Sequence, residues 1–182
     1  FGLVAGAHVE GCAHCRKRVY AFEAASGVAL QHAETSELDA GAFERVMARV
    51  SSAEPVRMPM IDTRPLLERL PLKPKKWVAP GVWVAAVDTP HAPNNRVYLL
   101  SVAPGGATAR HQHSGIEFCT VLKGAYRDEL GVFAAGDFAA AEHEFNHQPI
   151  VEGSETCVCL FATEGRLKPQ GLLGRLAFAY AN

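Results

Sequence analysis

The sequence predicts a mainly β fold, an antiparallel β-barrel or jelly roll, with a small all-α unit at its N-terminus. From Trp77 onward, short apolar segments alternate with Gly, Pro and Asn residues, a pattern typical of all-β barrels and sandwiches. Before residue 50, apolar side chains recur instead at helical spacing. Two histidines and one glutamate lie inside the β region between apolar segments, which indicates that polar chemistry is built into the barrel.

Two helices are expected in the N-terminal part. The first follows Cys15, where an apolar stripe of roughly helical period is formed by Val19, Phe22, Ala25 and Val28. The second is expected over residues 39–50, with Ser36 or Asp39 as its cap and an apolar side made by Phe43, Val46 and Met47. Such stripes usually build a core. Because helices totalling about 50 residues are marginal on their own, a zinc ion or a partner protein is needed to stabilise them.

The division of the chain follows from a proline-containing segment without a clear period, which indicates a linker. We expect a helical unit at residues 1–50, a linker at 51–62 and a β domain at 63–182. Within the β domain, strands are expected at residues 77–78, 81–87, 97–102, 117–122, 132–133 and 156–163. The apolar tail at 172–180 fits either a covering helix or an edge strand.

Composition limits the possible functions. With 48% hydrophobic and 20% charged residues, a chain of 182 residues can form a core. Its net charge of −1 argues against direct, electrostatically driven binding of nucleic acid. No run of about 18 or more apolar residues is present, so we expect no membrane-spanning segment. The chain begins with Phe1, inside an apolar pattern, and we expect the natural N-terminus to lie upstream of it.

Three of the cysteines lie in apolar, strand-like segments: Cys119, Cys157 and Cys159. Residues two apart on one strand are separated by roughly 6.5–7 Å with parallel side chains, which is a poor geometry for a disulfide. We therefore expect buried, reduced thiols, and with them a cytoplasmic protein.

The most specific motif in the β region is His111-x-His113-x-x-x-Glu117, preceded by Gly105 and followed by Gly124. Residues two apart on a strand point to the same face, so the two imidazoles project together, and Glu117 keeps that parity beyond a short turn. Two imidazoles and a carboxylate that converge form the outline of a metal site. The pattern G-x5-H-x-H-x3-E-x6-G is similar to the first signature motif of the cupin superfamily at every fixed position.

A fourth ligand is expected from a later strand. The segment 131–138 predicts a strand with a tight Gly-Asp turn, where Ala134 replaces the proline of the usual second cupin motif. His147 is the favoured ligand because it leads directly into the strand at Ile150. His143 is the alternative, but its two glutamate neighbours are typical of a solvated connection.

A second group of potential ligands lies near the N-terminus. His8, Cys12 and Cys15 have the spacing H-x3-C-x2-C, which places them on one stripe of a helix, or lets them converge across a break at Gly11. Thiolates and imidazole are the preferred ligands of Zn²⁺. Three ligands are one short of a closed structural site, so the fourth is left to a residue upstream of Phe1 or to water.

A small helical unit with H-x3-C-x2-C, joined by a proline-containing linker to a single cupin, resembles the ChrR family of zinc-binding anti-sigma factors along essentially the whole chain. The resemblance implies two Zn²⁺ sites, one at His8, Cys12 and Cys15 and one at His111, His113, Glu117 and His147. It implies a partner, a group IV (extracytoplasmic-function) sigma factor held by the N-terminal helices. It also implies a cupin that mediates release on oxidative stress of the singlet-oxygen type. The family has an upstream histidine ligand that this sequence lacks.

Two other classes remain open from the residues alone. Three histidines and one glutamate are also how non-haem Fe(II), Ni or Mn dioxygenases hold their metal, so a cupin metalloenzyme is the alternative. Metal identity and coordination number discriminate the two, because four ligands close a tetrahedral zinc and leave an octahedral iron open. A cupin that binds a sugar or a small carboxylate without chemistry is the third class. The appended Cys/His unit favours a regulator that is not an enzyme, with a homodimer through the cupin left open.

Overall fold

The computed structural model describes residues 1–52, 65–90, 96–143, 145–165 and 167–170. Most of the expected linker and the whole apolar tail at 172–180 lie outside the described residues. Two compact units are present, one made of Phe1–Arg16 with Leu70–Asn182 and the other of Lys17–Arg69. We describe the first as the barrel unit and the second as the helical unit.

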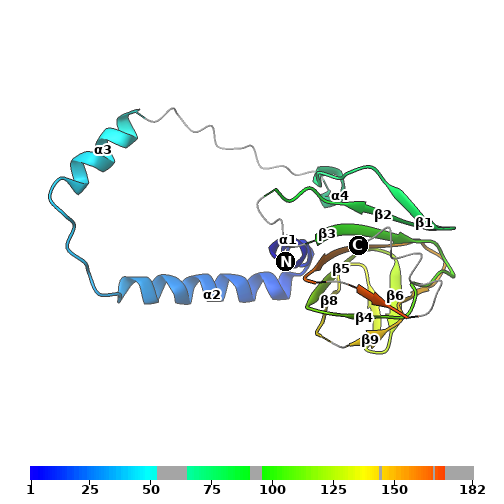
Figure 1. The fold of residues 1–182 in the computed structure, drawn as a ribbon. Coiled ribbons are helices and arrows are strands. Elements are labelled where there is room, and N and C mark those ends of the chain that lie inside the picture. The colour runs from blue at the N-terminus through cyan, green and yellow to red at the C-terminus, as the bar shows by residue number, and fades with distance from the viewer. Residues whose placement is uncertain (53–64, 91–95, 144, 166, 171–182) are drawn as a thin grey trace. The chain divides into compact units, whose positions relative to one another are not determined.

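The barrel unit is built from antiparallel strand pairs, as Figure 1 shows for its main sheet. Six strands form this sheet in the order β1-β2-β3-β11-β5-β8: β1 (Lys76–Ala79), β2 (Val82–Ala86), β3 (Arg96–Val102), β11 (Cys157–Thr163), β5 (Glu117–Lys123) and β8 (Phe138–Ala141). A second sheet has the order β10-β6-β7: β10 (Ile150–Glu152), β6 (Ala125–Asp128) and β7 (Gly131–Ala134). A third has the order β12-β4-β9: β12 (Leu167–Pro169), β4 (His111–His113) and β9 (Asn146–His147).

The core of the barrel unit lies around the central strand β11. Its seven residues are all buried, because β3 and β5 flank it and side chains cover both of its faces. A buried cluster joins it to β5, β6 and β10, formed by Val102, Cys119, Val121, Tyr126, Val151, Cys157, Cys159 and Phe161. The predicted burial of the three strand cysteines is confirmed, and all five cysteines are free thiols.

The two glycines that enclose the predicted motif sit at turns that need them. Gly105 and Gly124 have φ of +72° and +68°, a left-handed conformation that side chains other than glycine rarely adopt. At Gly124, a Cβ would also lie 2.7 Å from the carbonyl oxygen of Thr156, so the turn into β6 excludes any larger residue.

The first helix, α1 (Gly2–Gly11), packs on the barrel, mainly against β5. Val4 is completely buried, and its carbonyl accepts a hydrogen bond of 2.8 Å from Thr120 Oγ1 on β5. The Phe1 ring contacts Phe118 edge to face at 4.9 Å. A ten-residue helix with three glycines is not stable alone, so this contact with β5 is what maintains it.

The compact units therefore differ from the expected division at residue 50. Residues 1–16 belong with the barrel, because Phe1 and Val4 cover outward-facing side chains of β5. The chain then continues through α2 (Ala13–Gln31), α3 (Ala42–Ser52) and the short α4 (Leu66–Arg69).

The helical unit has no core of its own among its described helices. α3 begins after Gly41, and neither Ser36 nor Asp39 caps it; the Asp39 carboxylate pairs with Arg45 instead. No residue of α2 or α3 is buried, and large apolar side chains are exposed on both helices: Val19, Tyr20, Phe22, Val28, Leu30, Phe43, Val46, Met47 and Val50. The expectation that these stripes build a core is wrong for this isolated chain.

Candidate metal centres

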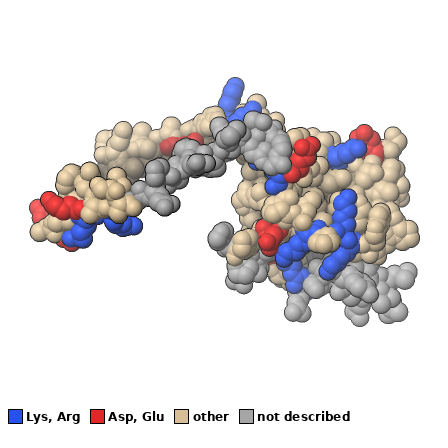
Figure 2. All heavy atoms as spheres, turned by 90° about the horizontal axis from the view of Figure 1, so that it is seen from above, with Lys and Arg blue, Asp and Glu red and all other residues tan. Residues whose placement is uncertain are grey.

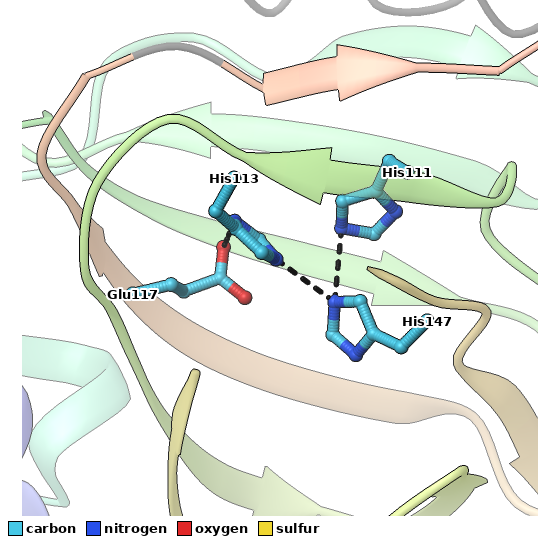
Figure 3. Close-up of side chains that lie close together, drawn as sticks. All are labelled: His111, His113, Glu117 and His147. Carbon is cyan, nitrogen blue, oxygen red and sulfur yellow. Dashed lines mark hydrogen bonds and ion pairs between the residues drawn. The ribbon is translucent and has the colours of Figure 1, made fainter. Parts of the chain in front are cut away.

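The cupin group forms where three strands meet. β4 carries His111 and His113 to the same side, and both are buried. Glu117 opens β5 after the turn, and β9 pairs with β4 so that His147 lies opposite His111. Figure 3 shows the four side chains pointing toward one another. The structure thus brings together all four of the residues predicted for this group.

Distances between the four side chains define a small common space. His147 Nε2 lies 2.9 Å from His113 Nε2 and 3.2 Å from His111 Nε2 (Figure 3). The carboxylate of Glu117 is 3.7 Å from His113 Nδ1. One ligand atom of each residue lies within 4.8 Å of every other, and all four residues are buried. This donor set, three imidazoles and one carboxylate, fits a divalent metal ion.

Outer partners orient two of the imidazoles. His111 Nδ1 donates to the carbonyl of Ala109 at 2.8 Å, and His147 Nδ1 donates to Asp128 Oδ2 at 2.9 Å. A proton held on Nδ1 leaves the lone pair of Nε2 directed into the common space, the arrangement that metal-binding histidines usually have. Sequence reasoning missed Asp128, because the pairing that brings the end of β6 beside β9 links residues far apart in the chain.

The electrostatics of the group follow from its burial. Burial lowers the pKa of His111 to about 4 and that of His113 to about 3, so both imidazoles are neutral at physiological pH. Burial raises the pKa of Glu117 to about 8, although a hydrogen bond with Tyr98 opposes the shift. Neutral imidazoles and a buried carboxyl, which a cation can convert to the carboxylate, suit the site to binding a cation.

The alternative ligand, His143, is exposed and is not part of this group. His147, which leads into the strand at Ile150, is the histidine that lies with His111, His113 and Glu117.

The N-terminal group also converges, within the barrel unit. Cys12 lies between α1 and α2 with an extended backbone, so the helix ends at Gly11. Of the two expected arrangements, a single helical stripe or a break at Gly11, the structure has the break. His8 Nε2 lies 3.2 Å from Cys15 Sγ, and the three potential ligand atoms are within 4.8 Å of one another. A hydrogen bond from the backbone N–H of Cys15 lowers the pKa of the Cys12 thiol, although burial opposes the shift.

The barrel supplies the outer partner of this group. His8 Nδ1 donates to the carbonyl of Gly136 at 2.6 Å, and the His8 ring lies 5.8 Å from the ring of Phe138. The orientation of His8 therefore depends on the turn between β7 and β8. No sequence signal pointed to this contact, because 128 residues separate its two partners.

Comparison with known proteins assigns the family. Residues 72–167 match the family model described as the ChrR Cupin-like domain. Over 97% of its length the chain is 32% identical to the anti-sigma-E factor ChrR of Cereibacter sphaeroides, of which it covers 86%. The chain belongs to the ChrR family. The predicted resemblance and the cupin fold are thereby confirmed.

A solved structure supports the ChrR assignment along most of the chain. The crystal structure of Rhodobacter sphaeroides SigE in complex with the anti-sigma ChrR is similar with a TM-score of 0.72 and 32% identity. The match covers 90% of this chain and 87% of that chain, so it extends beyond the cupin of this ChrR-family protein. Among its described residues, no helix combines the length and the apolar character needed to cross a bilayer.

Proposed function

We propose that this chain is an anti-sigma factor of the cytoplasm that holds an extracytoplasmic-function sigma factor on the apolar faces of α2 and α3. The observation that carries the proposal is the exposure of these faces. Along α3, Phe43, Val46, Met47 and Val50 follow the spacing of one helical face, and each is at least 45% exposed. Apolar surface of this extent on an unpacked helix marks a protein interface.

The family supports a sigma factor as the partner. The relative that is 32% identical is an anti-sigma factor, and the similar solved structure holds ChrR together with SigE. The exposed helices would gain their missing core from the partner, because binding would bury apolar stripes that none of the described residues covers. The same relatives favour regulation over the dioxygenase alternative.

Zinc is the ion that we assign to both groups. His8, Cys12 and Cys15 are a borderline-soft set that suits Zn²⁺, with the fourth position left to water or to a residue outside the group. His111, His113, Glu117 and His147 supply a complete tetrahedral set. A bound zinc would tie β4, β5 and β9 together, and its perturbation by oxidative stress is the step that we assign to release of the sigma factor.

Binding of a purified extracytoplasmic-function sigma factor tests the proposal. The variant Phe43→Ser with Met47→Ser should weaken binding at least tenfold, because both side chains lie on the apolar face of α3. Arg49→Ser, which lies outside the apolar face of the same helix, is the control and should leave the affinity within twofold. Equal affinities of the two variants, or no sigma binding by the unaltered zinc-loaded chain, would refute the interface.

A further inference from the structure

A cavity of about 160 Å³ opens inside the barrel beside the cupin group. Apolar side chains of the large sheet make most of its wall, among them Val84, Leu100, Val102 and Phe161. Its polar lining includes three of the four cupin residues: His111, Glu117 and His147. The cavity is thus a mainly apolar space with potential metal ligands in its wall. The anti-sigma function does not use it.

The volume limits what the cavity can hold. An apolar protein cavity of about 150 Å³ accommodates one benzene-sized molecule, whereas several waters in such a space would lack polar partners. The cavity in this chain therefore has room for one ring or one branched aliphatic group of similar size. A sugar does not suit it, because its hydroxyl groups would face apolar walls without hydrogen-bond partners.

One polar side chain in the lining lacks a partner. Thr108 Oγ1 is buried and makes no hydrogen bond to any residue that the structure describes. Thr108 lines the cavity three residues before His111, and its own backbone is satisfied, since the N–H donates to Pro149 and the carbonyl accepts from Gln148. Only the hydroxyl remains available, as a donor to an acceptor atom of a ligand.

We propose that the barrel cavity binds a small monocyclic carboxylic acid, with its ring among the apolar side chains and its carboxylate toward Thr108 and the cupin metal. The charge of the centre favours an acid. A divalent ion with neutral imidazoles and one carboxylate keeps one net positive charge in a mostly apolar surrounding, and an anionic head group neutralises it. This inference rests on the metal centre proposed above, and it does not depend on sigma binding.

Calorimetric titration of the zinc-loaded full chain with sodium benzoate tests the proposal. Benzoate should bind once per chain and at least tenfold more tightly than benzamide, which has the ring without the charge, or acetate, which has the charge without the ring. The zinc content of a Cys12→Ser, Cys15→Ser variant, in which the N-terminal group is removed, separates the two possible failures. Zinc present without benzoate binding overturns the cavity site alone, and absence of zinc overturns the metal centre on which it rests.

Two variants locate the site. Val84→Phe fills the cavity and should weaken benzoate binding at least tenfold, whereas Val132→Phe, on an exposed position of β7, should leave it unchanged. Thr108→Val keeps the shape and removes the hydroxyl. It should weaken benzoate several-fold while the ligand-free protein unfolds at an equal or higher temperature. Unchanged benzoate affinity in Thr108→Val, or in a folded Val84→Phe, overturns the proposal, as does benzamide binding equal to that of benzoate.

Discussion

The packing of α1 on β5 makes a quantitative prediction for Val4→Ala. Val4 is completely buried, so the substitution removes two buried carbon groups, at about 0.8 kcal/mol each. The space left behind raises the loss to about 2 kcal/mol, and the higher helix propensity of alanine returns about 0.5 kcal/mol. The net loss of about 1.5 kcal/mol corresponds to roughly a tenfold shift toward undocked α1.

Amide hydrogen exchange along α1 measures this shift directly, because undocking exposes the amides of a helix that is unstable alone. The matched control is Val28→Ala, the same chemical change at a position of α2 that is 54% exposed. It should leave exchange in α1 unchanged. If α1 in Val4→Ala keeps the protection of the unaltered chain, the contact with β5 does not hold the helix, and the assignment of residues 1–16 to the barrel fails.

Further predictions concern the metal groups. Because the pKa of Glu117 is about 8, zinc must displace its proton at lower pH, and the apparent affinity of zinc for the cupin should fall about fivefold from pH 8 to pH 7. Competition with a fluorescent chelator, in a Cys12→Ser, Cys15→Ser background, measures this pH dependence of the zinc affinity. The further substitution Glu117→Gln should remove the pH dependence. An equal pH dependence with and without Glu117→Gln would contradict the assignment. Asp128→Asn should weaken zinc binding about 10–100-fold in the same assay, because it disturbs the partner of His147 Nδ1, and an unchanged affinity would show that Asp128 does not orient that ring. Replacement of Cys15 by Ser alone should lower the zinc content by one ion per chain while the cupin retains its own, as elemental analysis would show; retention of both ions would remove Cys15 from the site.

The cupin group could be predicted from the sequence because its information is local. The spacing of His111, His113 and Glu117 determines which face of β4 and β5 they share, and strand periodicity is a reliable guide within a few residues. His147 had to be chosen over His143, and the choice rested on the position of His147 directly before the strand at Ile150 and on the acidic neighbours of His143.

What could not be predicted depends on contacts between distant segments. The strand β9 has only two residues, too short for any periodicity, yet its pairing with β4 is what brings His147 to the group. The docking of α1 was missed because glycine and alanine give this helix no distinct apolar face. The sequence of β5 held a partial signal for this docking. Phe118 and Thr120 alternate with the inward-facing residues of the strand, so another segment had to pack on its outer face, and α1 does so.

The continuity of α2 has a consequence for dissecting this protein. The boundary between the two compact units falls between Arg16 and Lys17, within one uninterrupted helix from Ala13 to Gln31. A protease or an engineered truncation therefore has no loop there at which to separate them, and a fragment ending at residue 50 would carry α1 away from β5 with Val4 exposed. Sigma binding and sensing should therefore be separated by point substitutions in the intact chain, since a helical fragment that includes α1 removes part of the cover of β5.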